Sequence, residues 1–275
     1  NFARRLVFGS IALILLIGII AGVGSRGPVV EHKTALVIAP KGSIVEQYSG
    51  SPVDRALARA LGEDVLEIQL RDILRAIDGA AADPHIDRIV IVPDLLTSAG
   101  YSTLMEVGAA LKRFKASGKE IIAFGDGMEQ RGYYLAAHAD KVYLHPEGAV
   151  LLEGIGRYRT WMGDLWQRLL ADISALRKIE PGKLAADVDN YVALIQANQG
   201  DLATLALEQG LVDELKTRDE VRAMLIEKGA ADEENKTFRQ VAVDEYAQYL
   251  AAKDMLDATQ VMLRSTQRLR VPPPH

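Results

Sequence analysis

Short apolar runs alternate with amphipathic segments through the central part of the chain. Residues 89–92 and 121–124 are apolar at every position, which is typical of strands buried on both faces of a sheet. Between these runs, apolar residues recur every three or four positions, at Leu104, Val107 and Leu111, as one face of a helix requires. Because strands alternate with helices, the pattern predicts an α/β domain whose parallel strands are joined by right-handed crossovers.

The same pattern predicts further strands and turns around this stretch. The domain is expected to open as strand, turn and strand, and to close with two strands separated by a turn at residues 145–148. A tight turn at residues 125–127 is expected to lead from a strand into a helix. The expected strands are residues 35–38, 44–45, 86–92, 121–124, 141–144 and 149–152.

The predicted α/β domain occupies residues 34–160, and the chain beyond it is mostly helical in pattern. Residues 161–254 carry apolar positions at helical spacing and are expected to form a helical extension of the same repeat. A last strand is expected near residues 238–243. Residues 255–275 resemble an apolar and basic C-terminal tail, which we expect to be joined to the extension across missing sequence.

An uncharged apolar run precedes the domain. Residues 6–23 contain Ser10 as their single polar side chain. A helix of this length extends roughly 27 Å, close to the ~30 Å hydrocarbon core of a bilayer. The sequence therefore predicts a transmembrane helix at residues 6–23, with residues 1–5 as a cytoplasmic N-terminal remnant and residues 24–33 as a linker.

Flanking residues bear on the topology of this segment. Arg4 and Arg5 precede it and Arg26 follows it, which favours a cytoplasmic N-terminus under the positive-inside rule. A cleavable signal peptide is the alternative, because residues 21–25 contain small residues that a signal peptidase accepts. The chain begins with Asn1, and we expect a native N-terminal stretch ahead of it. With a retained anchor, the domain is expected outside the cytoplasm.

Composition excludes several classes of function. The formal net charge of −5 provides no broad basic field, so we expect no nucleic-acid partner. The chain has no cysteine, which excludes disulfides, thiolate metal sites and a cysteine nucleophile. The histidines have neither HExxH nor paired spacing, so we expect no metal and no cofactor. They are His32, His85, His138, His145 and His275.

Three motifs carry a family resemblance. Residues 111–123 are LKRFKASGKEIIA, residues 132–148 are GYYLAAHADKVYLHPEG, and residues 200–215 are GDLATLALEQGLVDEL. Each motif is weak by itself. In this order they resemble the N-terminal crotonase-like repeat of long-form signal peptide peptidase A, a peptidase family of the serine-lysine type.

The resemblance implies a fold, an activity and partners. The fold would be a crotonase (ClpP)-like repeat of ββα units with a helical extension. The activity would be that of a serine endopeptidase degrading cleaved signal peptides, with a lysine base whose pKa is lowered by burial. Apolar signal peptides, the lipid bilayer and identical subunits, as a tetramer, would be its partners. The domain would lie on the periplasmic or extracytoplasmic side of the bacterial inner membrane.

The chain departs from the family pattern at the catalytic positions. Arg131 occupies the position equivalent to the nucleophilic serine, so no catalytic residue is expected in this repeat. The glycine pair of the oxyanion loop corresponds to residues 97–100, which are small without being paired glycines. Within that loop, Ser98 fits an ordinary loop serine better than a substitute nucleophile.

Two segments of the family pattern are missing. The region with the lysine base would follow residues 154–160, and a second repeat would start near residues 246–254. Both junctions are interpreted as missing internal sequence, and a natural compact paralogue is the alternative. Lys178 and Lys183, the lysines nearest the first junction, lie in a polar turn where a solvated role is expected.

Other polar residues have structural explanations. Asp94, Asp126 and Glu129 occupy loops where crotonase hydratases place acids, but capping or turn roles are expected. Tyr133 and Tyr134 are expected to be packing residues. A catalytically inactive, membrane-anchored scaffold or peptide-binding subunit is therefore the alternative to the peptidase, and an acyl-CoA hydratase is a third hypothesis.

Overall fold

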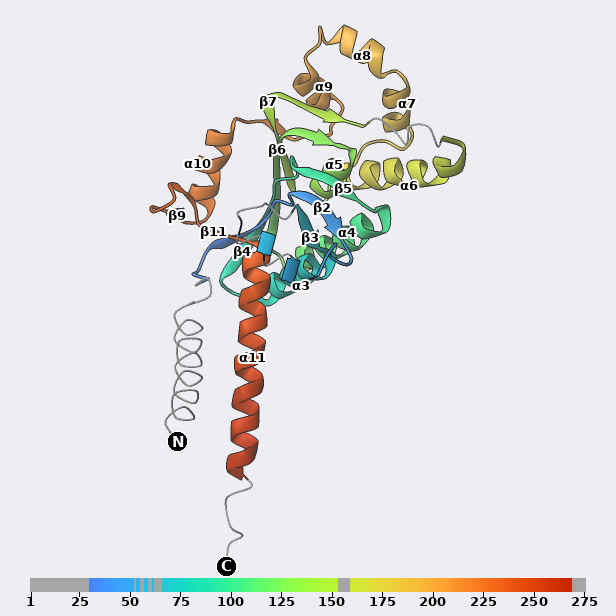
Figure 1. Ribbon diagram of the computed structural model, residues 1–275. Coiled ribbons are helices and arrows are strands. Elements are labelled where there is room, and N and C mark those ends of the chain that lie inside the picture. Colours follow the sequence, from blue (N-terminus) through green and yellow to red (C-terminus); the bar gives the residue numbers. More distant parts are fainter. Residues whose placement is uncertain are drawn as a thin grey trace, which may run out of the picture. The chain divides into compact units, whose positions relative to one another are not determined.

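The computed structural model describes residues 30–51, 53–54, 57–58, 61, 66–152 and 159–268 (Figure 1). Residues 30–250 form one compact unit, and residues 251–268 belong to a second. The predicted transmembrane helix at residues 6–23 lies outside the described residues. Within them, no helix is both long enough and apolar enough to cross a bilayer.

The largest sheet among the described residues has six strands, and all neighbouring strands run parallel. Its order is β11-β1-β4-β6-β7-β8, and the last of the described strands pairs with the first of them, so that Leu36 lies opposite Val241. This parallel order confirms the predicted α/β class. The strands are β1 Thr34–Ile38, β4 Ile86–Ile91, β6 Glu120–Glu129, β7 Lys141–Leu151, β8 Glu214–Leu215 and β11 Gln240–Ala242.

A second parallel sheet of the described residues contains β2 (Gly42–Val45), β3 (Glu67–Gln69) and β5 (Leu96–Ala99) in the order β3-β2-β5. Strand β2 follows β1 along the chain, and β5 follows β4. In both cases the first strand belongs to the six-stranded sheet and the second to the three-stranded sheet, so the two strands form no hairpin. A helix at residues 70–82 follows β3, and a helix at residues 101–116 follows β5. The arrangement supports the predicted ββα repeat of a crotonase (ClpP)-like fold. The short strands β9 (Ala231–Asp232) and β10 (Thr237–Phe238) pair antiparallel by themselves.

Helices follow the strands and dominate the C-terminal part. They are α3 Leu70–Ala82, α4 Tyr101–Ala116, α5 Gln130–Ala136, α6 Arg159–Arg177, α7 Lys183–Asp189, α8 Tyr191–Ala197, α9 Leu202–Glu208, α10 Arg218–Lys228 and α11 Val243–Arg268. A capping box between Thr217 and Glu220 starts α10. Gly118, with φ of 82°, follows the end of α4, where the left-handed backbone conformation favours glycine. Helix α11 passes without a break through residues 254 and 255, where the sequence divides the extension from the tail.

The predicted turns at residues 125–127 and 145–148 are wrong, because both segments lie inside continuous strands, β6 and β7. The pairing of these strands shifts register between Gly125 and Gly127. A Cβ atom on Gly148 would come within 2.3 Å of the carbonyl oxygen of Asp126. The glycines thus let the two neighbouring strands bulge together without ending. A local turn signal cannot reveal a matching irregularity in the neighbouring strand.

The main sheet buries both of its faces. Ile89 and Ile121 lie in the larger core with α3 and α4, whereas Val90 and Ile122 lie in the smaller core with Val221 of α10. Figure 1 shows α10 on the opposite side of the sheet from α3 and α4. Successive residues of a strand point to opposite faces, so an apolar residue at every position is what a sheet covered on both sides requires.

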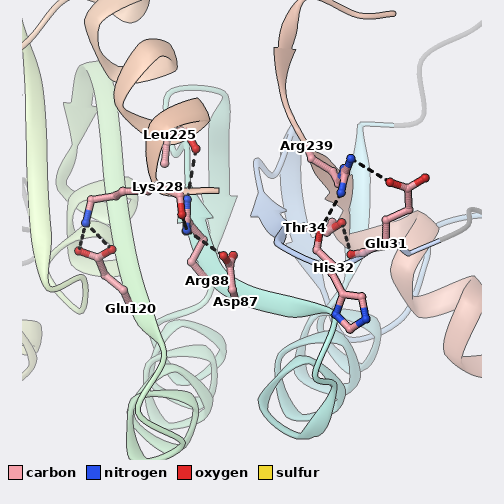
Figure 2. Close-up of polar contacts among 9 residues, drawn as sticks. All are labelled: Glu31, His32, Thr34, Asp87, Arg88, Glu120, Leu225, Lys228 and Arg239. Carbon is pink, nitrogen blue, oxygen red and sulfur yellow. Dashed lines mark hydrogen bonds and ion pairs between the residues drawn. The ribbon is translucent and has the colours of Figure 1, made fainter. Parts of the chain in front are cut away.

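A buried arginine fixes the C-terminal end of α10 to β4 (Figure 2). Arg88 is 6% exposed and donates to the carbonyl oxygens of Leu225 at 3.2 Å and Lys228 at 2.6 Å. It also donates to the carboxylate of Asp87 at 2.8 Å, and Lys228 pairs with Glu120 on β6 at 2.9 Å. The carbonyl oxygen of Leu225 also accepts from the backbone N–H of Gly229, whereas the carbonyl of Lys228, at the last position of the helix, has no intrahelical donor. Arg88 therefore supplies a hydrogen bond that the end of α10 lacks.

A second polar group in Figure 2 ties the start of β1 to the chain beside β11. Arg239 pairs with the carboxylate of Glu31 at 2.9 Å and donates to the carbonyl oxygen of His32 at 2.8 Å. The hydroxyl of Thr34 donates to the carbonyl oxygen of Glu31 at 2.7 Å. The two contacts of Arg239 hold together segments from opposite ends of the compact unit, and the Thr34 bond is local to the first segment.

Candidate functional site

A cavity of about 220 Å³ opens between the end of β5 and the helices α4, α5 and α6. It lies where the sequence places the equivalents of the oxyanion loop and of the nucleophile. Residues 97–100 form the end of β5 and the N-cap of α4. The lining residues are Ala99, Tyr101, Leu104, Gln130, Arg131, Leu165 and Leu169.

Arg131 lies in the first turn of α5 and is exposed. A cation is disfavoured there, because the N-terminal end of a helix carries partial positive charge. Among the described residues, no hydrogen bond or ion pair to Arg131 offsets this cost. No contact in the described part of the chain therefore ties the guanidinium to α5, and Arg131 lines the cavity.

Gly100 is the N-cap of α4, with φ of −65° and ψ of 149°, and provides no side-chain cap. The first turn of α4 starts directly after it, and Tyr101 and Leu104 of that turn line the cavity. Ser98 is exposed on β5, opposite Ser43 of β2, and is not part of the cavity lining. Its location agrees with an ordinary serine at a strand end.

The two lysines near the first junction lie away from the cavity lining. Lys178 is exposed just after α6, with φ of 56°. Lys183 starts α7 and forms an exposed ion pair with Asp187 at 2.7 Å. The described lining of the cavity thus contains neither a serine nor a lysine, and it has no nucleophile and base pair.

Beneath Tyr101, three further side chains join α4, α5 and α6. The hydroxyls of Tyr101 and Tyr134 both donate to Asp172 of α6, at 3.5 and 3.3 Å. The Tyr134 ring stands edge-on to His138 with centroids 5.1 Å apart. Burial raises the pKa of both tyrosines, and the neighbouring Asp172 charge adds to the effect. These phenols stay protonated and act as donors that connect the helices.

His138 is buried against α4. Its Nδ1 lies 2.9 Å from the carbonyl oxygen of Tyr134, so Nδ1 must carry the proton because a carbonyl only accepts. Burial lowers the pKa of His138 to about 4, and the hydrogen bond to Tyr134 opposes this shift. A Cβ atom on Gly108 would come within 2.6 Å of its Nε2. The imidazole is therefore a neutral packing group.

Of the three acids expected in loops, Asp94 lies in a turn after β4, whereas Asp126 and Glu129 lie in β6, so the expected loop position is wrong for these two. Asp94 accepts hydrogen bonds from the backbone N–H groups of Asp126 at 3.1 Å and Gly127 at 3.4 Å. Arg218 of α10 pairs with Asp126 at 2.6 Å and with Asp94 at 3.4 Å. Burial raises the pKa of Asp94. Glu129 is the N-cap of α5, but its side chain makes no capping hydrogen bond, in contrast to its expected role.

The predicted packing role of the paired tyrosines is confirmed. Tyr133 is fully buried and donates to the carbonyl oxygen of Leu211 at 2.6 Å, and Tyr134 is 3% exposed. In the part of the chain that the structure describes, no cluster of three or more histidine, aspartate or glutamate side chains could hold a metal ion.

Comparisons with known proteins identify relatives of this chain. No protein-family model matches it. It is 27% identical over 298 residues to Protease 4 of Salmonella typhi, covering 90% of this chain and 48% of that protein. It is 25% identical over 292 residues to Protease 4 of Haemophilus influenzae, covering 85% of this chain and 47% of that protein. The chain spans about half the length of the curated relatives it matches.

Two solved structures are also similar. An enoyl-CoA hydratase/isomerase family protein from Silicibacter pomeroyi gives a TM-score of 0.44 at 15% identity, over 88% of this chain and 97% of that chain. The ClpP protease catalytic domain from Plasmodium falciparum gives 0.42 at 13% identity, over 66% and 86%. Because both TM-scores are below 0.5, the fold of this chain is assigned from its own strand order and not from these structures. The two proteins named Protease 4 confirm the resemblance of this chain to the signal peptide peptidase A family.

Proposed function

We propose that this chain is part of a membrane-anchored serine endopeptidase that degrades cleaved signal peptides. In this proposal, residues 30–250 form the repeat that has no nucleophile. The serine and the lysine base belong to segments outside the residues described. Residues 6–23 anchor the protein in the bacterial inner membrane, with the α/β unit on the periplasmic or extracytoplasmic side.

One observation carries the proposal. Relatives named Protease 4 match nearly the whole chain, and Arg131, which the family resemblance makes equivalent to the nucleophilic serine, lines a cavity beside residues 97–100. The cavity is where a nucleophile and an oxyanion loop would meet if the repeat were active. A non-nucleophilic half of a peptidase would keep this cavity and lack the serine.

The proposed substrates and assembly follow from the same reasoning. Cleaved signal peptides are apolar, and five of the seven described residues that line the cavity have apolar or aromatic side chains: Ala99, Tyr101, Leu104, Leu165 and Leu169. An apolar lining removes the hydrophobic side chains of such peptides from water. A tetramer of identical subunits is proposed from the family resemblance.

A serine-directed fluorophosphonate probe tests the proposal. The full-length gene product is purified from detergent-solubilised membranes, treated with the probe and digested, and the labelled peptide is identified by mass spectrometry. We expect one labelled serine outside residues 30–250. The Ser98→Ala variant serves as the matched control and should label as strongly as the wild type. Labelling lost in that variant, or absent from a folded wild-type protein, would contradict the proposal.

The alternative function is a catalytically inactive, membrane-anchored subunit that binds peptides. The absence of serine and lysine from the described cavity lining favours it. The same experiment separates the two functions, because the inactive subunit binds peptides without reacting with the probe.

A further inference from the structure

The cavity beside Arg131 has two chemically different sides. Leu104 of α4 and Leu165 and Leu169 of α6 form an apolar wall. Gln130 and Arg131 form the polar edge, at the start of α5. A ligand that fits this cavity therefore has an apolar group at one end and a polar group next to it.

The size of the cavity limits the apolar group. At about 220 Å³ it exceeds the ~150 Å³ that accepts a benzene ring in an engineered protein cavity, but is smaller than the ~300 Å³ of the smallest pockets for drug-sized ligands. One large aliphatic or aromatic side chain fills such a space. A folded segment or a large cofactor does not fit in it.

The charge at the edge selects the polar group. Arg131 is exposed and has no partner among the described residues, and its guanidinium carries five N–H donors. A guanidinium binds a carboxylate through two parallel hydrogen bonds, and it repels an ammonium group. The amide of Gln130 adds a neutral donor and acceptor on the same edge.

We propose that this cavity binds the carboxyl-terminal residue of an apolar peptide. The last side chain lies against Leu104, Leu165 and Leu169, and the free α-carboxylate pairs with Arg131. The choice of a peptide over another carboxylate depends on the proposed function. The repeat without a nucleophile thereby acts as an anchor for one end of the substrate or for a released product.

Fluorescence anisotropy tests this inference. The probes are two hexapeptides of identical sequence, AVLALL, each carrying an N-terminal fluorophore, one with a free carboxylate and one with a C-terminal amide. The wild type should bind the acid at least about tenfold more tightly than the amide, because a hydrogen bond to a charged group contributes about 1.5–3 kcal/mol. Arg131→Gln should abolish this difference and leave the weak binding of the amide unchanged.

Two further variants act as controls. Arg222→Gln removes another exposed arginine, on α10, and should leave the preference for the acid intact. Leu165→Ala shortens the apolar wall and should weaken the acid and the amide by similar factors. Equal binding of acid and amide by the wild type would overturn the inference, as would an equal loss in the two arginine variants.

Competition with hexanoate decides the source of the carboxylate. The unlabelled peptide acid should displace the probe at a concentration at least about tenfold lower than hexanoate does. If hexanoate competes equally well, the site binds any apolar carboxylate and the assignment to a peptide terminus is wrong. These measurements require no hydrolysis, so a negative result in the serine-labelling experiment would leave them intact, and their own failure would leave the peptidase proposal intact.

Discussion

The contacts of Arg88 lead to a prediction about how α10 is held on the sheet. Arg88→Met keeps a long apolar stem but removes the guanidinium, which donates to two carbonyl oxygens at the end of α10 and to Asp87. The side chain of Arg88 is buried, whereas that of Asp87 is 30% exposed. Gly229 follows the helix at a point where a Cβ atom would lie 2.9 Å from Nη1 of Arg88, so the backbone is closely fitted to this arginine.

The contacts give the size of the effect. The bond to Lys228, at 2.6 Å, is short and charged, and losing such a bond costs about 2–3 kcal/mol. The bond to Leu225 is longer, at 3.2 Å, and contributes about 1 kcal/mol. The pair with Asp87 adds less than about 1 kcal/mol, because the carboxylate is partly solvated. The expected loss is therefore ~3–5 kcal/mol, a large fraction of the ~5–15 kcal/mol by which a typical protein is stable.

Urea unfolding, followed by circular dichroism, measures the change in free energy. Hydrogen exchange of the amides of α10 reports whether that helix detaches before the rest of the unit unfolds. Arg222→Met, on the same helix, is the control, since its exposed pair with Asp219 should contribute less than about 0.5 kcal/mol. If Arg88→Met changes neither the urea midpoint nor the exchange of α10 by more than the control does, the capping role of Arg88 is refuted.

Three further substitutions have defined outcomes. The pKa of His138 is about 4 in the folded chain, and its ordinary value is 6.5. Below pH 6.5 the unfolded chain therefore takes up a proton that the folded chain excludes. The free energy of unfolding should consequently fall by about 2 kcal/mol between pH 6.5 and pH 5. His138→Asn should remove this pH dependence in urea titrations. Gly42→Ala should lower the thermal midpoint strongly, since φ is +74° and the new Cβ would meet the Leu66 carbonyl oxygen at 2.2 Å; an unchanged midpoint would show that β2 can move. Tyr133→Phe should cost about 1–3 kcal/mol in urea unfolding by leaving the carbonyl oxygen of Leu211 without its donor, and a loss below 0.5 kcal/mol would show that water replaces the hydroxyl.

The sequence is sufficient to predict the alternation of strands and helices, because burial on both faces of a sheet leaves a local signal. Residues 89–91 and 121–124 are apolar without interruption, and the structure divides them between two cores. The helix between them ends before Gly118, as its sequence indicates. Each of these features depends on neighbours within about ten positions.

Features that depend on distant partners could not be predicted. Arg88 looks like a surface residue inside a strand, yet its main acceptor is 140 positions away, at Lys228. The pairing of β11 with β1 joins segments about two hundred positions apart. The bulge shared by β6 and β7 uses glycines that appear locally to be turns. In each case the tertiary contact determines the conformation and the local pattern does not.

The candidate site shows why a motif can reveal a fold without revealing an activity. Gly132 follows Arg131, and a Cβ atom there would come within 3.0 Å of Pro93 at the end of β4. Tyr133 holds the carbonyl oxygen of Leu211, and Tyr134 packs on His138. The recognisable residues of this motif are therefore the ones that position α5, whereas Arg131 is exposed and makes no such contact with the described residues. A change at position 131 alters the chemistry of the cavity while the helix that carries it stays in place, so the cavity can take a new ligand without a new fold.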